Sequence, residues 1–208
     1  MDPSPWSDGS LGAEAQLVLL DAAERSIRSG LAGEGPLVPD AGSLAGLPPA
    51  VLVSRGVFVT VQVYGALNGC IGSLEARRPL FVAVPTLAWE AAFADPRLPA
   101  LTWADEPGLS VKVSVLSPLE PLDLDSEAEL LAALRPGVDG LLIAAGARRA
   151  TFLPAVWETL PDRLDFLSHL QAKARLPRGQ WLPGTRAYRY TTLEFGRDPR
   201  STATQSGH

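Results

Sequence analysis

Cysteine and histidine are scarce in this 208-residue chain, which contains one cysteine, Cys70, and two histidines. A single cysteine excludes an intramolecular disulfide framework and any cysteine-rich zinc or iron–sulfur site. A two-histidine metal motif would have to recruit His208 from the end of the chain, because His169 is the only other histidine. We therefore predict that the protein uses no metal and no cofactor.

Long apolar runs are also missing. No segment approaches the roughly 18 consecutive apolar residues of a membrane-spanning helix. Residues 1–5 lack the basic start and the apolar stretch of a signal peptide. Hydrophobic residues make up 46% of the chain and charged residues 20%, as in ordinary globular proteins. We predict a cytoplasmic protein with a substantial core and no membrane contact.

Basic charge is in short supply, and its distribution is uneven. The formal net charge is −5, yet residues 146–208 contain ten of the 18 basic residues and five of the 23 acidic ones. This basic region could contact an acidic partner or nucleic acid, but core-forming segments interrupt it, so a solvated surface is the better interpretation. No basic cluster is interleaved with aromatic residues, and we predict no nucleic-acid binding.

Hydrophobic periodicity predicts an α+β protein in which hairpins dominate. In the first half we expect a helix over 13–29, a long connection over 30–50, strands over 57–64 and 70–74, a helix over 86–94 and a strand over 109–116. Asn68 and Gly69 lie between the first two strands and favour positive φ, so we expect them to form the hairpin turn. Pro85 is expected in the first turn of its helix.

The second half continues the same pattern. We expect a helix over 126–134, a second hairpin over 140–143 and 149–153, a short helix over 154–160, a helix over 162–174 and a last strand over 187–195. The terminal segments 1–10 and 198–208 are predicted to be disordered tails, because they are rich in small and polar residues.

The motif Leu67-Asn68-Gly69-Cys70-Ile71-Gly72 after a β-branched strand resembles the AMMECR domain family, known in bacteria and archaea as protein A of the AmmeMemoRadiSam system. Further matching segments include Phe93-Ala94-Asp95-Pro96-Arg97, Gly140-Leu141-Leu142-Ile143, Ala150-Thr151-Phe152-Leu153-Pro154 and Phe166-Leu167-Ser168-His169-Leu170. The resemblance covers about residues 12–196. It departs at Asn68, where the family has arginine, so any anion contact of that arginine would lack its charge here.

The resemblance implies a two-lobed fold in which each lobe is an antiparallel sheet with flanking helices. The larger lobe would comprise 11–118 plus 185–197, and the smaller, inserted lobe 119–184. The family motif would line a cleft between the lobes, with the binding residues Leu67, Asn68, Gly69, Cys70, Ile71 and Gly72. A Memo-like protein and a radical S-adenosylmethionine (SAM) enzyme are the partners that the resemblance implies, and the family's own activity is not established.

Cys70 and His169 are the candidate catalytic residues. A thiol at the start of a strand can act as a nucleophile, and a distant histidine permits a Cys–His pair. Equally, a free cysteine is often a small buried hydrophobe. Asp165 lies one helical turn before His169, so its carboxylate could orient the imidazole, or the two could form an ordinary surface pair.

Two functions remain open from the sequence. The first is a component of a protein- or small-molecule-modification pathway that uses Cys70 on a peptide or organic substrate. The alternative is a non-catalytic binding or adaptor module that captures a peptide or partner protein in the cleft. An enzyme should gather polar side chains around the Cys70 sulfur, whereas a binding module should offer a mostly apolar groove.

Overall fold

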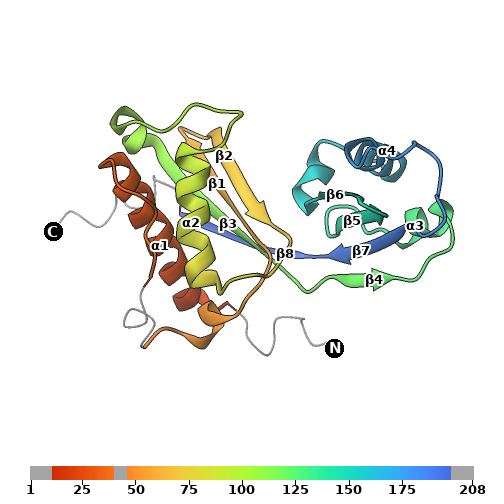
Figure 1. Ribbon diagram of the computed structural model, residues 1–208, viewed down its shortest axis with the longest axis horizontal. Coiled ribbons are helices and arrows are strands. Elements are labelled where there is room, and N and C mark those ends of the chain that lie inside the picture. The colour runs from red at the N-terminus through yellow and green to blue at the C-terminus, as the bar shows by residue number, and fades with distance from the viewer. Residues whose placement is uncertain (1–10, 40–45, 198–208) are drawn as a thin grey trace. The chain divides into compact units, whose positions relative to one another are not determined.

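The computed structural model describes residues 11–39 and 46–197, and the tails predicted over 1–10 and 198–208 lie outside these ranges. Packing divides the chain into two units (Figure 1). The first unit contains the chain up to Leu116 and again from Leu193, and the second unit is Ser117–Thr192. No helix of the described residues is long and apolar enough to cross a membrane.

The first unit, within the described residues, is built on a four-stranded sheet in the order β2-β1-β3-β8. The strands are β1 (Val57–Val63), β2 (Ala66–Ser73), β3 (Leu109–Leu116) and β8 (Thr192–Arg197). Helices α1 (Ala13–Leu31) and α2 (Leu80–Phe93) pack side by side on one face of this sheet (Figure 1). Two short 3₁₀ helices, η1 (Pro49–Leu52) and η2 (Trp103–Gly108), precede β1 and β3 in the chain.

Alternation along β1 and β3 explains which face the helices cover. Val57, Val59 and Val61 are buried in the first core, together with residues of α1 and α2. Because successive side chains of a strand point to opposite faces, Thr60 lies on the face opposite the two helices. The predicted strand over 109–116 is confirmed as β3, which pairs antiparallel with β1.

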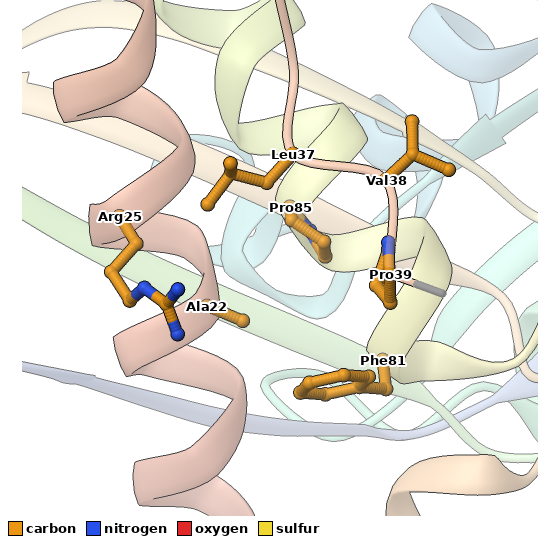
Figure 2. A pocket seen from close by; sticks show the side chains of 7 residues that line it. All are labelled: Ala22, Arg25, Leu37, Val38, Pro39, Phe81 and Pro85. Atoms are coloured by element: carbon orange, nitrogen blue, oxygen red, sulfur yellow. The ribbon is translucent and has the colours of Figure 1, made fainter. Parts of the chain in front are cut away.

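Helix α2 begins earlier than the sequence indicates. It starts at Leu80 rather than near Thr86, and Pro85 lies inside the helix, not in its first turn. The ring of Pro85 is buried beside a pocket that also contacts α1 and the segment around Leu37 (Figure 2). A proline inside a helix loses one backbone hydrogen bond, so packing against α1 and the sheet overrides this local preference.

The first hairpin is confirmed, but the prediction of its turn was wrong. Tyr64 and Gly65 form the turn, with φ of 49° and 83°, as a two-residue hairpin turn of this handedness requires. The Tyr64 amide donates to the carbonyl of Gly108 at 2.8 Å, which helps to hold this left-handed tyrosine. The register with β1 shifts between Val61 and Gln62, so Asn68 is the extra residue of a β-bulge inside β2.

The second unit has its own four-stranded sheet in the described chain, in the order β4-β7-β5-β6. The strands are β4 (Glu120–Leu122), β5 (Gly140–Ala145), β6 (Arg148–Phe152) and β7 (Arg186–Tyr190), and the helices are α3 (Glu127–Ala133), α4 (Arg163–Lys173) and the 3₁₀ helix η3 (Pro154–Glu158). Ser126 and Asp162 cap α3 and α4 through their side chains. The α+β prediction with two antiparallel sheets is confirmed.

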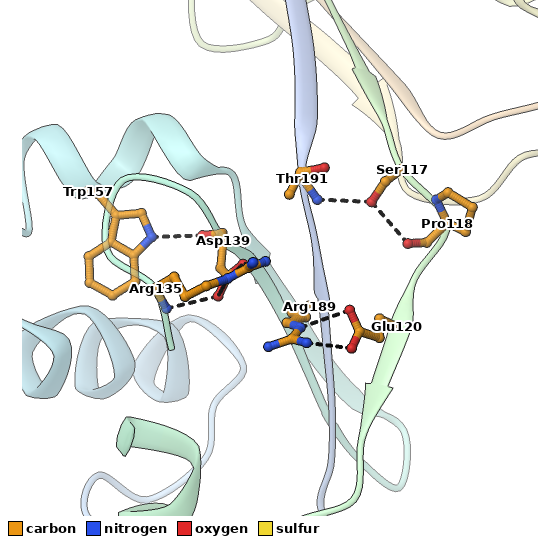
Figure 3. A network of polar contacts seen from close by, with 8 residues as sticks. All are labelled: Ser117, Pro118, Glu120, Arg135, Asp139, Trp157, Arg189 and Thr191. Carbon is orange, nitrogen blue, oxygen red and sulfur yellow. Dashed lines mark hydrogen bonds and ion pairs between the residues drawn. The ribbon is translucent and has the colours of Figure 1, made fainter. Parts of the chain in front are cut away.

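Polar contacts connect the segments of the second unit (Figure 3). Arg135 donates to the buried carboxylate of Asp139, with a shortest distance of 2.6 Å. The indole nitrogen of Trp157 donates to the Asp139 carbonyl at 2.7 Å, and the Trp157 ring stacks on Phe166. These contacts join the segment after α3 to η3 and α4.

The last strand was predicted as one element over 187–195, and this prediction was wrong. The chain instead forms β7 and β8, which belong to the sheets of different units. The boundary between the units falls after Thr192, so residues 185–192, expected in the larger lobe, belong to the second unit. Both strands carry β-type periodicity, so no local pattern indicates the change of sheet at Thr191.

Candidate functional site

Cys70 lies near the middle of β2, the strand at one edge of the first sheet as described. It pairs with Thr60 of β1, and the Thr60 hydroxyl donates to the Cys70 sulfur, with 3.3 Å between Oγ1 and Sγ. Thr60 also pairs with Lys112 of β3. A half-buried thiol, a hydroxyl and an ammonium group therefore form a row across three strands, on the face opposite α1 and α2.

The row continues onto β8. Lys112 Nζ lies 3.6 Å from Glu194 Oε1, and the hydroxyl of Ser114 donates to Glu194 Oε2 at 3.1 Å. Lys112 and Glu194 are about half exposed, so their charges face solvent and are screened. Cys70 thus supplies the thiol of this face, and among the described residues the Thr60 hydroxyl hydrogen-bonds to it.

Asp95 and Arg97 hold the backbone of Cys70 from the segment that follows α2. The Cys70 amide donates to Asp95 Oδ2 at 3.0 Å, and Arg97 Nη2 donates to the Cys70 carbonyl at 3.0 Å. These are the groups that an edge strand leaves without a ladder partner. The Asp95–Arg97 pair therefore occupies, at Cys70, the position that another strand would take.

The pair itself is held in a fixed geometry. Arg97 donates through Nε to Asp95 Oδ1 at 2.9 Å and through Nη2 to Oδ2 at 2.6 Å. The Asp95 residue is only 5% exposed, whereas the Arg97 side chain is 61% exposed. Hydrogen bonds from Arg97, and then from the Cys70 amide, hold the pKa of Asp95 well below its usual range. Asp95 is therefore a carboxylate at neutral pH.

Gly69 permits the close approach of β2 to α2. A Cβ atom at Gly69 would clash with the backbone carbonyl of Ala91 in α2, so only glycine fits this position. Asn68, in the bulge, donates from Nδ2 to the Pro99 carbonyl at 3.4 Å. The bulge and the glycine together fix where Cys70 lies along the edge.

The remaining motif residues face different surroundings. Leu67 is 51% exposed next to the hairpin turn. Ile71 packs against the first core. Gly72 lies where a Cβ would clash with Phe58 of β1. The motif is therefore a bulged edge strand with alternating faces, and its membership of a cleft stays a prediction.

His169 is exposed on α4 in the second unit, and Cys70 belongs to the first. Its Nδ1 donates to the backbone carbonyl of Asp165 at 2.8 Å, so the contact uses the backbone and not the Asp165 carboxylate. The proposed Cys–His pair stays a prediction. The described residues contain no group of three or more histidine, cysteine, aspartate or glutamate side chains placed to hold a metal.

In the sequence, Asp95-Pro96-Arg97 stands out only as part of a segment that matches the family, and the structure adds an ion pair between Asp95 and Arg97. Sequence reasoning missed the contacts of this pair with Cys70, which lies 25 residues earlier than Asp95. No local pattern reports such a contact. The only available signal was that the same family resemblance included both segments.

Comparison with known proteins identifies the chain's relatives. The model of the AMMECR1 family matches residues 20–195. A protein of Methanothermobacter thermautotrophicus is 40% identical over 154 residues, covering 73% of this chain and 80% of that protein. A protein of Methanocaldococcus jannaschii is 38% identical over 149 residues, covering 68% of this chain and 72% of that protein.

A solved structure agrees with these sequence matches. The crystal structure of an uncharacterised protein from Pyrococcus horikoshii superposes with a TM-score of 0.76 at 32% identity, covering 88% of this chain and 91% of that one. Sequence and fold therefore agree over most of the chain. The protein belongs to the AMMECR1 family.

Proposed function

We propose that this AMMECR1-family protein is a component of a protein- or small-molecule-modification pathway and presents the Cys70 thiol as its reacting group. The observation that carries the proposal is the fixed position of Cys70. Asp95 and Arg97 bind its amide and its carbonyl, while Thr60 donates to its sulfur. A functional group held by backbone contacts and oriented by a neighbouring hydroxyl is pre-organised for chemistry.

The surroundings of the thiol support a reaction with a substrate that comes from solvent. Cys70 is half-buried, whereas a purely structural cysteine is usually fully buried. Lys112 lies in the same cross-strand row, next but one to Cys70. Its ammonium group pairs with Glu194, so this row carries little net charge and suits an uncharged peptide or organic substrate.

The family resemblance supports the pathway context. It suggests that the protein acts with a Memo-like protein and a radical SAM enzyme. In this proposal the radical SAM enzyme carries out the radical reaction. The present chain binds the substrate or an intermediate at Cys70. The missing arginine at Asn68 would narrow the range of anionic substrates that the motif holds.

A binding or adaptor role is the second candidate, and the tip of the first hairpin favours it. Tyr64, in the turn, is 75% exposed, and Leu67, the first residue of the motif, is 51% exposed. Large apolar side chains that remain exposed together at a turn are typical of protein contact sites. In this alternative Cys70 is a structural residue of the edge strand, and the hairpin tip makes the contact.

Alkylation with iodoacetamide tests the first proposal, because Cys70 is the only cysteine and every label reports on it. We expect the folded protein to be labelled at a rate comparable to that of a free thiol. The Thr60→Val variant removes the hydroxyl that contacts the sulfur but keeps the shape, and it should change this rate. Labelling that occurs only in denaturant would contradict the proposal and favour the adaptor role.

Association with co-expressed partners separates the two candidates. If the hairpin tip is the contact site, Leu67→Ser should weaken co-purification with a Memo-like protein while Cys70→Ser should not. If Cys70 reacts, Cys70→Ser should abolish formation of the pathway's modified product even though the partners still associate. Leu17→Ser, which removes an equally exposed leucine on α1 in the first unit, is the matched surface control.

A further inference from the structure

A pocket of about 170 Å³ lies between α1, the segment 37–39 and the first half of α2 (Figure 2). Its walls are mostly apolar, and the lining residues are Ala22, Arg25, Leu37, Val38, Pro39, Phe81 and Pro85. Drug-sized ligands occupy larger cavities, of roughly 300–1,000 Å³. The size therefore suits a ligand with a single ring or a short branched chain.

Arg25 is the only charged residue among the described side chains that line this pocket. It is exposed, and it makes no ion pair or hydrogen bond with another described residue. The acidic neighbours on α1 are engaged elsewhere, because Arg197 binds Asp21 at 2.7 Å and Glu24 at 3.1 Å. The positive charge of Arg25 therefore remains available at the mouth of an apolar pocket.

We propose that this pocket binds a small organic carboxylate, with its apolar body against Phe81 and Pro85 and its carboxylate on Arg25. The guanidinium group presents paired donors that match a carboxylate in a bidentate contact. A phosphate group normally gathers several donors, including backbone amides at a glycine-rich loop. The described pocket lining offers one cationic side chain and no glycine, which favours the singly charged carboxylate.

The pocket is separate from the Cys70 site. Both involve α2, but the pocket uses Phe81 and Pro85 in its first half, whereas Gly69 of the motif approaches Ala91 near its end. The proposal therefore does not depend on Cys70 reacting. A carboxylate in this pocket would contact both α1 and α2 on the helix side of the sheet, whereas Cys70 lies on the opposite face.

Titration of the full-length, ¹⁵N-labelled protein with benzoate tests the proposal, and benzamide serves as the neutral ligand of the same shape. We expect benzoate to shift the amide resonances around Ala22, Arg25 and Phe81. Because Arg25 is exposed, the charge should make benzoate bind about threefold more tightly than benzamide. Arg25→Gln should remove this preference and leave benzamide binding unchanged.

Two further variants complete the experiment. Ala22→Leu fills the pocket from α1 and should weaken both ligands, with little effect on folding because leucine is a good helix former. Arg28→Gln removes a second exposed arginine of α1, which pairs with Glu106 and lies outside the pocket, and should change neither affinity. Equal binding of benzoate and benzamide, or resonance shifts confined to other parts of the chain, would overturn the proposal.

Discussion

Among the described residues, each unit buries one aspartate beneath a half-exposed arginine. Asp95 and Arg97 form this pair in the first unit, and Asp139 and Arg135 form it in the second. The shortest nitrogen–oxygen distance is 2.6 Å in both pairs. We call these two ion pairs the first and the second clamp, after the unit that contains each. They are chemically alike, and they differ in the other groups to which their aspartates are hydrogen-bonded.

The second clamp stabilises the core of its unit, whereas the first stabilises the edge strand β2. Asp139 bonds the amide of Arg135, four residues earlier, and its own carbonyl accepts from the buried Trp157. Asp95 instead reaches the amide of Cys70 on a different element. The same type of ion pair therefore stabilises packing in one unit and positions a candidate functional residue in the other.

Trp157→Ala should have the largest effect, because it breaks the core that the second clamp supports. The ring is 4% exposed and stacks on Phe166 with 3.7 Å between the ring centroids. Truncating a buried tryptophan costs about 3–5 kcal/mol of unfolding free energy. Hydrogen exchange of β5 amides measures the loss in the second unit. Trp103→Ala, at a 60% exposed position, is the control and should change stability by no more than about 0.5 kcal/mol.

Gly69→Ala is the corresponding disruption in the first unit. Its Cβ would meet the Ala91 carbonyl, which is backbone and cannot rotate away. Overpacking of this kind costs about 1–3 kcal/mol, and it should raise hydrogen exchange in β2 while β5 is unaffected. Gly35→Ala, where nothing lies within 4 Å of the added Cβ, serves as the control. Equal effects of the two substitutions would show that β2 can move away from α2.

Acid should weaken the Asp95–Arg97 pair that binds the Cys70 backbone. The Asp95→Asn variant, which cannot titrate at this position, should show how much of the acid sensitivity comes from Asp95. The Arg97 hydrogen bonds lower the pKa of Asp95 in the folded state, so its contribution to stability is complete above the unfolded value of about 3.9. The contribution is lost as pH falls below that value and through the lower, folded pKa. The wild-type first unit should therefore lose stability more steeply below about pH 4 than Asp95→Asn does.

Glu120→Gln is the matched control for this pH dependence. A hydrogen bond from Arg189 lowers the pKa of Glu120 as well, but the Glu120 side chain is 57% exposed and the pair is screened by solvent. Acid titration of β5 exchange should therefore differ little between Glu120→Gln and the wild type. An equally steep loss of stability with falling pH in the wild type and in Asp95→Asn would refute the role given to the Asp95–Arg97 pair.

Asn68→Arg should have the smallest effect on stability. It replaces a long hydrogen bond to the Pro99 carbonyl in a half-buried bulge, and surface changes of this kind stay within about 0.5 kcal/mol. If the motif is an anion site, the added charge should strengthen binding of inorganic phosphate in calorimetric titration. Asn68→Gln lengthens the side chain without charge and should show no gain. An equal response of both variants would remove the anion-site interpretation.

Local patterns predicted most of the elements. The alternation of Val111, Val113 and Val115 predicted β3 with its observed limits, and the helix predicted over 162–174 is present as α4. Both hairpins were found because each has two apolar runs around a turn. These features depend on neighbours within a few residues, and such neighbours are visible in the sequence.

The turn at Tyr64 and Gly65 could not be derived in this way. Asn68-Gly69 carries the stronger local turn signal. The fold nevertheless uses Gly69 to let α2 approach, and the Tyr64 amide is held by Gly108, 44 residues later along the chain. Tertiary contacts therefore outweighed the local preference. The same reason explains why α2 includes Pro85.

The sequence by itself determined the α+β class, the family motif and Cys70 as the sole possible thiol. Only the tertiary structure decided that Asp95 and Arg97 bind the Cys70 backbone, that Thr60 contacts its sulfur, and that the last strand segment divides between two sheets. Class and periodicity follow from short-range backbone geometry. Contacts between residues far apart in sequence form only when the sheet and helices pack together, so no local pattern encodes them.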